Sequence, residues 1–146
     1  MVILQGMKQL VCPNCQSLNR VDPARLAQAL CGKCAKNLAG GVLHLDAAAL
    51  DRFLARDELP LVVDFWAPWC GPCRMMAPAF DEAAQTLGAL VRMAKVDTEA
   101  HPQAGARFGV QSIPTLALFV GGREVDRLMG ARPARDIVAW VRKHLK

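Results

Sequence analysis

The stretch that decides the fold is "LPLVVDFWAPWCGPC", residues 59–73. Its first part is a near-continuous apolar run with β-branched side chains, which is typical of a strand that is covered on both faces. Two cysteines separated by two residues, Cys70 and Cys73, follow directly. We therefore expect a buried strand that leads into a helix, with the cysteine pair at the junction.

Strand and helix patterns alternate on both sides of this stretch. Strands are expected over residues 42–45, 59–67, 90–97, 114–120 and 123–129, and helices over residues 46–55, 74–88, 101–109 and 133–146. The resulting order is βαβαβαββα. Strands alternating with helices indicate an α/β fold, and the last two strands, joined by "GG", form a hairpin that adds antiparallel strands to the sheet.

The composition predicts a packed protein with a small appendage. A chain of 146 residues suits one ordinary domain, and 53% hydrophobic against 21% charged residues excludes disorder. The pattern changes near "AGG", residues 39–41, because cysteine-rich turns precede it and alternating strands and helices follow it. We expect a module over residues 1–40 and a domain over residues 41–146.

All six cysteines of the chain occur as pairs with the spacing C-x2-C. The first two pairs lie fifteen residues apart and supply four thiolates, from Cys12, Cys15, Cys31 and Cys34. C-x2-C-x15-C-x2-C is typical of a zinc site, because each two-residue turn directs both sulfurs at one point. About 40 residues do not bury enough apolar area to fold alone, so a bound metal ion is needed to stabilise the folded module.

One structural zinc ion is therefore predicted in the module, since four thiolates complete a tetrahedral shell and leave no position open for a substrate. Three other interpretations of these cysteines exist: two disulfides, a redox pair, or an iron–sulfur site.

The third pair has a different setting. Cys70 is expected at a helix N-terminus, where unpaired N–H groups and the helix dipole favour a thiolate. Cys73 falls one turn later, more buried, and should titrate at a higher pH. This asymmetry suits a reaction in which Cys70 attacks a substrate disulfide and Cys73 resolves the mixed disulfide. A structural disulfide is the other interpretation.

Charge and hydropathy limit the partners and the location. The net charge is +5, and residues 1–45 contribute +4 of it, with Asp22 as their only acid. Nucleic-acid binding is not expected, because no aromatic residue accompanies this charge and four zinc-bound thiolates would reduce it to +2. No run approaches about 18 uninterrupted apolar residues, so no membrane span is expected. Without an export signal at the start, we expect a cytoplasmic protein.

Two motifs resemble those of a known family. Residues 62–78, "VVDFWAPWCGPCRMMAP", match the active-site motif of thioredoxin, and residues 109–119, "GVQSIPTLALF", match its second signature. The resemblance covers residues 43–146, and the cysteine-rich module in front makes the whole chain similar to the thioredoxin-2 type of bacteria. It implies the thioredoxin fold, a central mixed β-sheet flanked by helices, preceded here by a small zinc-ribbon-like module.

The resemblance also implies an activity. Thioredoxins reduce disulfides in client proteins with their dithiol, need no bound cofactor for the redox step, and receive electrons from an NADPH-dependent thioredoxin reductase. We therefore expect a thiol-disulfide oxidoreductase that acts as a protein-disulfide reductase.

Asp64 lies in the middle of the apolar run, where burial should raise the pKa of its carboxyl group. The resemblance implies that it lies beneath the active site and exchanges a proton with Cys73 through water. A hydrogen-bonded structural carboxylate is the other interpretation. Lys95 matches a lysine that pairs with this aspartate in the family, although from the sequence alone it is equally a surface lysine.

The remaining site residues follow from the resemblance. Pro114 is implied to be cis and to face the cysteine pair, which brings Ile113 beside Cys70, where the exposed backbone pairs with an extended substrate peptide. Trp69 is implied to flank the site as a contact surface. Gly130 matches a glycine near the substrate groove, or else it only forms a turn before the last helix.

The residues around the pair set its potential and its contacts. Gly71 and Pro72, which belong to the implied substrate-binding surface, supply no cation to stabilise the thiolate, so the pair should be reducing, near about −270 mV. The sequence departs from the family pattern at two positions. Pro68 replaces the more usual acidic or small residue before Trp69, and Arg74 replaces the common lysine after the pair.

Two alternative functions exist. In the first, the chain is a redox-sensing interaction protein or holdase chaperone, in which oxidation expels zinc and the unfolded module binds clients. In the second, a nucleic-acid-binding zinc ribbon is fused to a redox domain. Retained dithiol activity after zinc removal would distinguish a reductase from a zinc-linked switch.

Overall fold

The structure, a computed structural model, describes residues 6–145. The apolar start of the chain, in which no export signal was expected, and Lys146, the end of the last expected helix, lie outside this range. We call residues 6–40 the N-terminal module and residues 41–145 the C-terminal domain.

The C-terminal domain contains a five-stranded sheet with the strand order β3-β5-β4-β6-β7. Its strands are β3 Val42–His44, β4 Leu61–Trp66, β5 Arg92–Asp97, β6 Thr115–Val120 and β7 Arg123–Met129. Its helices are α1 Ala47–Arg56, α2 Gly71–Leu87, α3 Pro102–Arg107 and α4 Ala134–His144, and the short 3-10 helix η3 spans Gly88–Leu90. The strands β3 and β4 run parallel to β5, whereas β6 is antiparallel to β4 and β7 to β6. The predicted mixed α/β fold and element order are confirmed.

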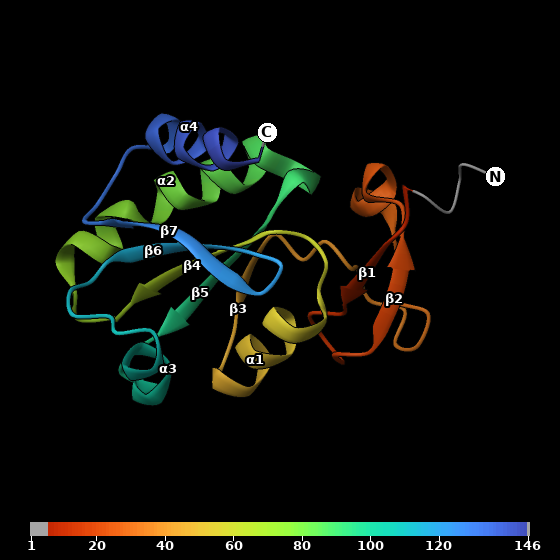
Figure 1. Cartoon of the computed structure of the whole chain (residues 1–146), viewed down its shortest axis with the longest axis horizontal. Coiled ribbons are helices and arrows are strands. Elements are labelled where there is room, and N and C mark those ends of the chain that lie inside the picture. Colours follow the sequence, from red (N-terminus) through yellow and green to blue (C-terminus); the bar gives the residue numbers. More distant parts are fainter. Residues whose placement is uncertain (1–5, 146) are drawn as a thin grey trace.

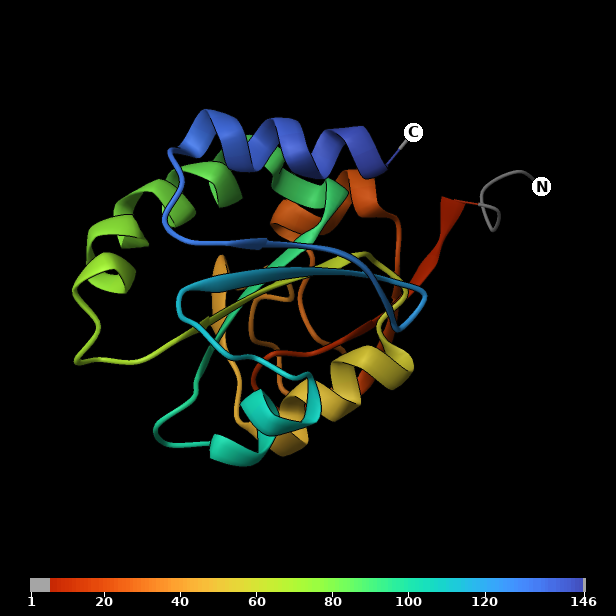
Figure 2. The same cartoon turned by 60° about the vertical axis from the view of Figure 1, so that its left-hand side comes forward.

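Helices cover both faces of the sheet. Figures 1 and 2 show α2 and α4 on one face and α1 and α3 on the other. The core follows this division, because Val62 packs with the side chains of α2 and α4, whereas Val63 and Phe65 pack with those of α1. Successive side chains of a strand point to opposite faces, so both faces of β4 are buried, as its apolar sequence predicted.

The N-terminal module is a two-stranded hairpin with a short helix. The strand β1 Lys8–Val11 pairs antiparallel with β2 Leu18–Val21, and the 3-10 helix η2 Pro23–Gln28 follows. Each C-x2-C turn ends on a residue with positive φ, Gln16 at 63° and Ala35 at 65°. The sequence predicted these turns but neither the hairpin nor the 3-10 helix, because each strand has only four residues and half of them are polar.

A buried ion pair of the C-terminal domain binds backbone groups of the N-terminal module. Arg92, at the start of β5, lies 3.2 Å from a carboxylate oxygen of Asp57, and both side chains are 2% exposed. The guanidinium group also donates to the carbonyl oxygens of Leu38 at 2.6 Å and of Val11 at 2.9 Å, and the N–H of Val11 donates to Asp57 at 2.8 Å. Burial raises the pKa of Asp57, and the charge of Arg92 opposes this shift.

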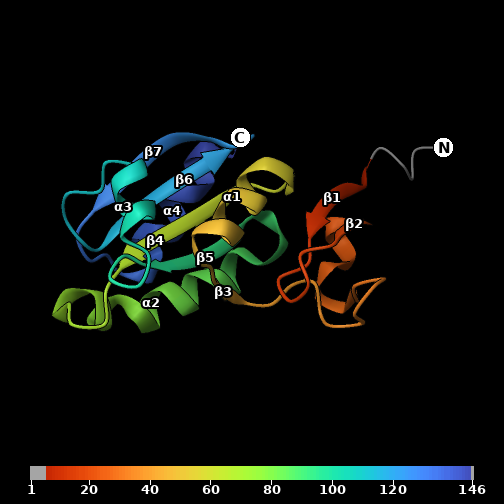
Figure 3. The same cartoon turned by 90° about the horizontal axis from the view of Figure 1, so that it is seen from below.

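The module and the start of helix α2 lie at opposite ends of the longest axis of the molecule (Figures 1 and 3). The strands β4 and β5 begin beside the module and run away from it, and β4 leads into the cysteine pair. The cysteine pair is therefore remote from the module. Within residues 6–145, no helix combines the length and the apolar character needed to cross a membrane.

Candidate functional site

The third cysteine pair lies at the N-terminus of α2, where the sequence predicted it. Cys70 is the N-cap residue of the helix, and its sulfur accepts a hydrogen bond from the N–H of Cys73 at 3.2 Å. The two residues form a disulfide in the structure. Cys70 is 4% exposed and Cys73 is fully buried. In the reduced state, the helix N-terminus and this N–H favour a negative charge on Cys70 rather than on Cys73.

The second signature motif lies against this pair. The sulfur of Cys70 is 3.8 Å from the carbonyl oxygen of Ile113, and the peptide bond between Ile113 and Pro114 is cis, as the resemblance implied. The N–H of Gly130 donates to the carbonyl of Pro114 at 2.9 Å. Gly130 has a φ of 93°, which favours glycine, and a Cβ atom added there would meet no other atom within 4 Å. The structure thus brings Cys70, Ile113, Pro114 and Gly130 together beside open space.

Exposed residues flank the buried sulfurs in the chain. The side chain of Trp69 is 66% exposed, and Gly71 and Pro72 form the first turn of α2. Met75, which the sequence analysis did not single out, is 80% exposed, whereas Met76 is buried in the core. The helical period could have identified this exposed methionine, because only one of two adjacent side chains on a helix faces the core.

Asp64 is a buried acid in the central strand β4. It is fully buried, and neither carboxylate oxygen has a hydrogen-bond partner among the described residues. Burial raises the pKa of Asp64 to about 7, and the charge of Lys95 opposes this shift. Asp64 shares the face of the sheet with Val62, which is the face covered by α2, the helix that carries Cys73. A carboxyl group with this pKa exchanges protons near neutral pH.

Lys95 is the neighbour of Asp64 on the adjacent strand β5, but the two side chains form no ion pair. The ammonium group of Lys95 instead lies 4.5 Å from the centre of the Trp66 ring, over its face. The resemblance implied a direct pairing of Lys95 with Asp64. In the structure the charge of Lys95 acts on Asp64 only at longer range. A cation–π contact stabilises the ammonium group in this position over the indole.

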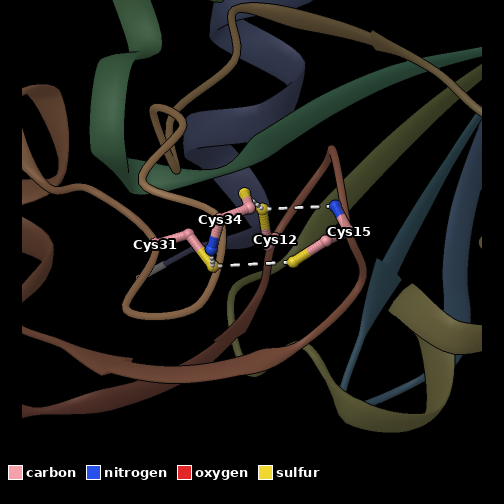
Figure 4. Close-up of side chains that lie close together, drawn as sticks. All are labelled: Cys12, Cys15, Cys31 and Cys34. Carbon is pink, nitrogen blue, oxygen red and sulfur yellow. Dashed lines mark hydrogen bonds between the residues drawn. The ribbon is translucent and has the colours of Figure 1, made fainter.

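The first two cysteine pairs meet in one cluster in the N-terminal module, with their side chains pointing toward one another (Figure 4). All four sulfur atoms lie within 4.8 Å of one another, and the Cys12–Cys34 and Cys15–Cys31 sulfur distances are both 3.6 Å. Zinc–sulfur bonds of about 2.3 Å in a tetrahedral shell require sulfur–sulfur distances of about 3.8 Å. The cluster therefore has the size that a tetrahedral zinc ion requires.

The surroundings of the cluster favour a thiolate at Cys31, whereas burial raises the pKa of the Cys12 thiol to about 11. Backbone N–H groups point at the first sulfur of each pair, from Cys15 to Cys12 at 3.5 Å and from Lys33 to Cys31 at 3.3 Å. The hydroxyl of Ser17 and the backbone N–H groups lower the pKa of Cys31 to about 5. All four residues are free cysteines, so the alternative of two disulfides has no support in the structure.

The comparison with protein families decides the classification. The Thioredoxin family model matches residues 41–143, which is most of the chain. The chain belongs to the thioredoxin family. Thioredoxins are thiol-disulfide oxidoreductases, and Cys70 and Cys73 occupy the positions of the redox pair in the motif.

Individual relatives agree with this classification. Thioredoxin 1 from Nostoc sp. is 48% identical over 88 residues, 60% of this chain and 82% of the relative. Thioredoxin C-3 from Corynebacterium nephridii is 39% identical over 139 residues, 94% of this chain and 95% of the relative. The second likeness extends through the N-terminal module. A thioredoxin domain behind two C-x2-C pairs fits the thioredoxin-2 type.

Proposed function

We propose that this thioredoxin reduces disulfide bonds in client proteins with the Cys70–Cys73 dithiol. The observation that carries the proposal is the position of the Cys70 sulfur, at the N-terminus of α2 and 3.8 Å from the carbonyl oxygen of Ile113. A client segment in extended conformation can pair with the backbone at Ile113, with its disulfide beside Cys70. The exposed Trp69 and the open space at Gly130 provide the remaining contact surface.

The reaction has two steps. The Cys70 thiolate attacks one sulfur of the client disulfide, a mixed disulfide forms, and the other client sulfur leaves as a thiolate that takes up a proton. The Cys73 thiolate then attacks the Cys70 sulfur, which forms the Cys70–Cys73 disulfide and releases the second client thiol. Two electrons pass from the protein dithiol to the client disulfide.

Asp64 is the proposed proton acceptor for Cys73. Cys73 is fully buried, so its thiol needs a nearby base to become a nucleophile at neutral pH. Asp64, with a pKa of about 7, is partly ionised there. Lys95 keeps a positive charge close enough to Asp64 to oppose the effect of burial, and its contact with Trp66 holds that charge in place.

The N-terminal module has a structural role in the proposal. We assign residues 1–40 to a module that holds one zinc ion through Cys12, Cys15, Cys31 and Cys34, and residues 41–146 to the redox domain. The ion would be enclosed by the four sulfur atoms, and these bonds would stabilise a small module that has little core of its own. The size of the sulfur cluster and the N–H groups directed at it support this assignment.

The electrons come from outside the chain. The family resemblance points to an NADPH-dependent thioredoxin reductase as the donor. We propose the cytoplasm as the compartment, since both the dithiol and four metal-binding thiolates require reducing conditions. No bound cofactor takes part in the redox step.

Reduction of insulin disulfides by the purified protein, with dithiothreitol as the electron source, tests the proposal. Cys70→Ser should abolish the activity, because the attacking thiolate is lost. In the absence of dithiothreitol, reduced Cys73→Ser protein should instead accumulate mixed disulfides with the client. Substantial turnover by the Cys70→Ser protein would contradict the mechanism.

A further inference from the structure

Arg74 and Pro68, which lie on either side of the cysteine pair in the sequence, are joined by a hydrogen bond. One terminal nitrogen of Arg74 donates a hydrogen bond of 2.8 Å to the carbonyl oxygen of Pro68. The bond connects helix α2 back to the turn after β4 and spans residues 69–73, which include both active-site cysteines. Both side chains are exposed, so the contact lies at the surface around the redox pair.

Arg74 lies where the helix itself disfavours it. It is the fourth residue of α2, and the positive end of the helix dipole repels a cation in the first turn. The Pro68 carbonyl offsets this repulsion by giving the guanidinium group an acceptor. A guanidinium group is planar and loses less freedom for each hydrogen bond than the flexible ammonium chain of lysine, so lysine is not an equivalent residue in this contact.

The position of Trp69 depends on this turn. Trp69 directly follows Pro68, its side chain is 66% exposed, and its indole makes no hydrogen bond among residues 6–145. No hydrogen bond of its own therefore holds the indole, and the backbone of the turn contributes to where it lies. Within the turn, the N–H of Cys70 donates a hydrogen bond of 3.1 Å to the carbonyl oxygen of Ala67. Pro68 has no N–H, so its carbonyl oxygen is the only polar backbone group through which a hydrogen bond can hold this residue.

We propose that Arg74 is a positioning residue for client binding: by holding the Pro68 carbonyl, it fixes the turn that presents Trp69 beside Cys70 and so sets the affinity for protein clients. The inference rests on the proposed function. The role of Arg74 depends on the directed hydrogen bond of its planar guanidinium group and not on its positive charge alone.

The test compares Arg74→Lys and Arg74→Gln with the wild type. Arg123→Gln is the matched control, because Arg123 is also exposed and lies in the β6–β7 hairpin, away from the cysteine pair. KM and kcat for insulin reduction are measured for each protein. Both Arg74 variants should raise KM by about three- to tenfold, the effect of losing one hydrogen bond to a charged group at an exposed site, with a smaller change in kcat. The control should keep the wild-type KM.

Fluorine NMR of fluorotryptophan-labelled protein gives a second readout that does not depend on a client. The resonance of Trp69, identified by its loss in Trp69→Phe, should shift and sharpen in both Arg74 variants, while those of Trp66 and Trp140 remain unchanged. A wild-type KM and an unchanged Trp69 resonance in Arg74→Gln would overturn the proposal, and so would a wild-type KM in Arg74→Lys, which would show that charge alone suffices. If the wild-type protein fails to reduce insulin, the proposed function fails, and the Trp69 resonance still decides the positioning role.

Discussion

At the scale of single residues, Asp64 connects the chemistry of the site to its pH dependence. Burial raises the pKa of this carboxyl group to about 7, and Lys95 opposes the shift without forming an ion pair. A group that changes its protonation near neutral pH suits proton exchange with a buried thiol. The same shift has a consequence for activity and a consequence for stability.

Asp64→Ala should slow insulin reduction most near neutral pH. The Cys73 thiol then lacks its proton acceptor, and the expected loss of kcat/KM is about tenfold or more, modest for a positioned acid–base group. At alkaline pH, where Cys73 ionises without help, the loss should shrink. A pH profile of the rate from mildly acidic to alkaline conditions measures this, and a loss of equal size at every pH would leave Asp64 with a structural role only.

Asp64→Asn should stabilise the oxidised protein, but only above acidic pH. The folded state holds the Asp64 proton with a pKa of about 7, against the ordinary value of 3.8 for an aspartate, so the wild type loses stability as the pH rises from about 4 to about 7. The neutral amide removes this titration. Because one pKa unit corresponds to about 1.4 kcal/mol, Asn should raise the free energy of unfolding by roughly 2–4 kcal/mol at pH 8 and by little near pH 4. Urea unfolding at both pH values checks this, and an equal effect at both would contradict the assigned pKa.

The sequence predicted the residue-scale site well where a local pattern carried the information. An acid inside an apolar run identified Asp64, and a cysteine pair at a strand–helix junction identified Cys70 and Cys73. The cation–π position of Lys95 was not predictable, because it depends on how side chains of two neighbouring strands share one face of the sheet.

At the scale of structural elements, one buried arginine contributes to the contact between the module and the domain, beside the hydrogen bonds that Gln9 makes with Arg56 and Glu58. Arg92 binds Asp57 at the end of α1 and, through backbone carbonyls, the segments of Val11 and Leu38 next to the cysteine cluster. Every one of these partners is distant in the sequence, and even Asp57 is separated from Arg92 by 35 positions. The charged residue inside the apolar run "LVRMAKVD" was a signal of a buried charge, but the run does not identify its partner.

Arg92→Met should destabilise the whole chain by roughly 3–5 kcal/mol, because it leaves the buried carboxylate of Asp57 unpaired. Urea unfolding measures this, with Arg123→Met as the control at an exposed arginine. The double variant with Asp57→Asn should recover part of the loss, since the amide oxygen still accepts the N–H of Val11. A loss below about 1 kcal/mol in the single variant would contradict the role assigned to the ion pair.

The sequence predicted the elements of the C-terminal domain in their order, because long periodic segments carry most of that information. Within the module it predicted only the turns. The strands β1 and β2 have four residues each, and pairing of β1 with β2 and docking to Arg92 hold them, rather than a periodic apolar pattern of their own.

At the scale of the whole molecule, the two cysteine sites lie at opposite ends. The module contacts the starts of β4 and β5, and the redox pair follows the end of β4 (Figure 3). This placement was not predictable from the sequence, which left open whether the module packs near Cys70. In the structure the module does not cover the redox pair, so direct shielding of Cys70 by the module is not expected.

A fragment of residues 41–146 should keep insulin reduction within about a factor of ten of the full chain, because the active-site residues are intact, and a tenfold change corresponds to only about 1.4 kcal/mol. Its stability should fall, since Arg92 loses the carbonyl acceptors of Val11 and Leu38 and the core loses the side chain of Val11. Steady-state rates, with circular dichroism to confirm folding, measure both effects. A folded but inactive fragment would show that the module is part of the catalytic machinery.

The central claim is that one cysteine pair performs the redox reaction and the other two pairs bind metal. The most direct test traps the Cys73→Ser protein with an oxidised client, maps the linked cysteine by mass spectrometry, and counts zinc in the same preparation. We predict that the client is linked to Cys70 alone and that one zinc ion per chain remains bound. A client linked to Cys12, Cys15, Cys31 or Cys34, or a zinc content near zero in protein prepared under reducing conditions, would contradict this division of the cysteines.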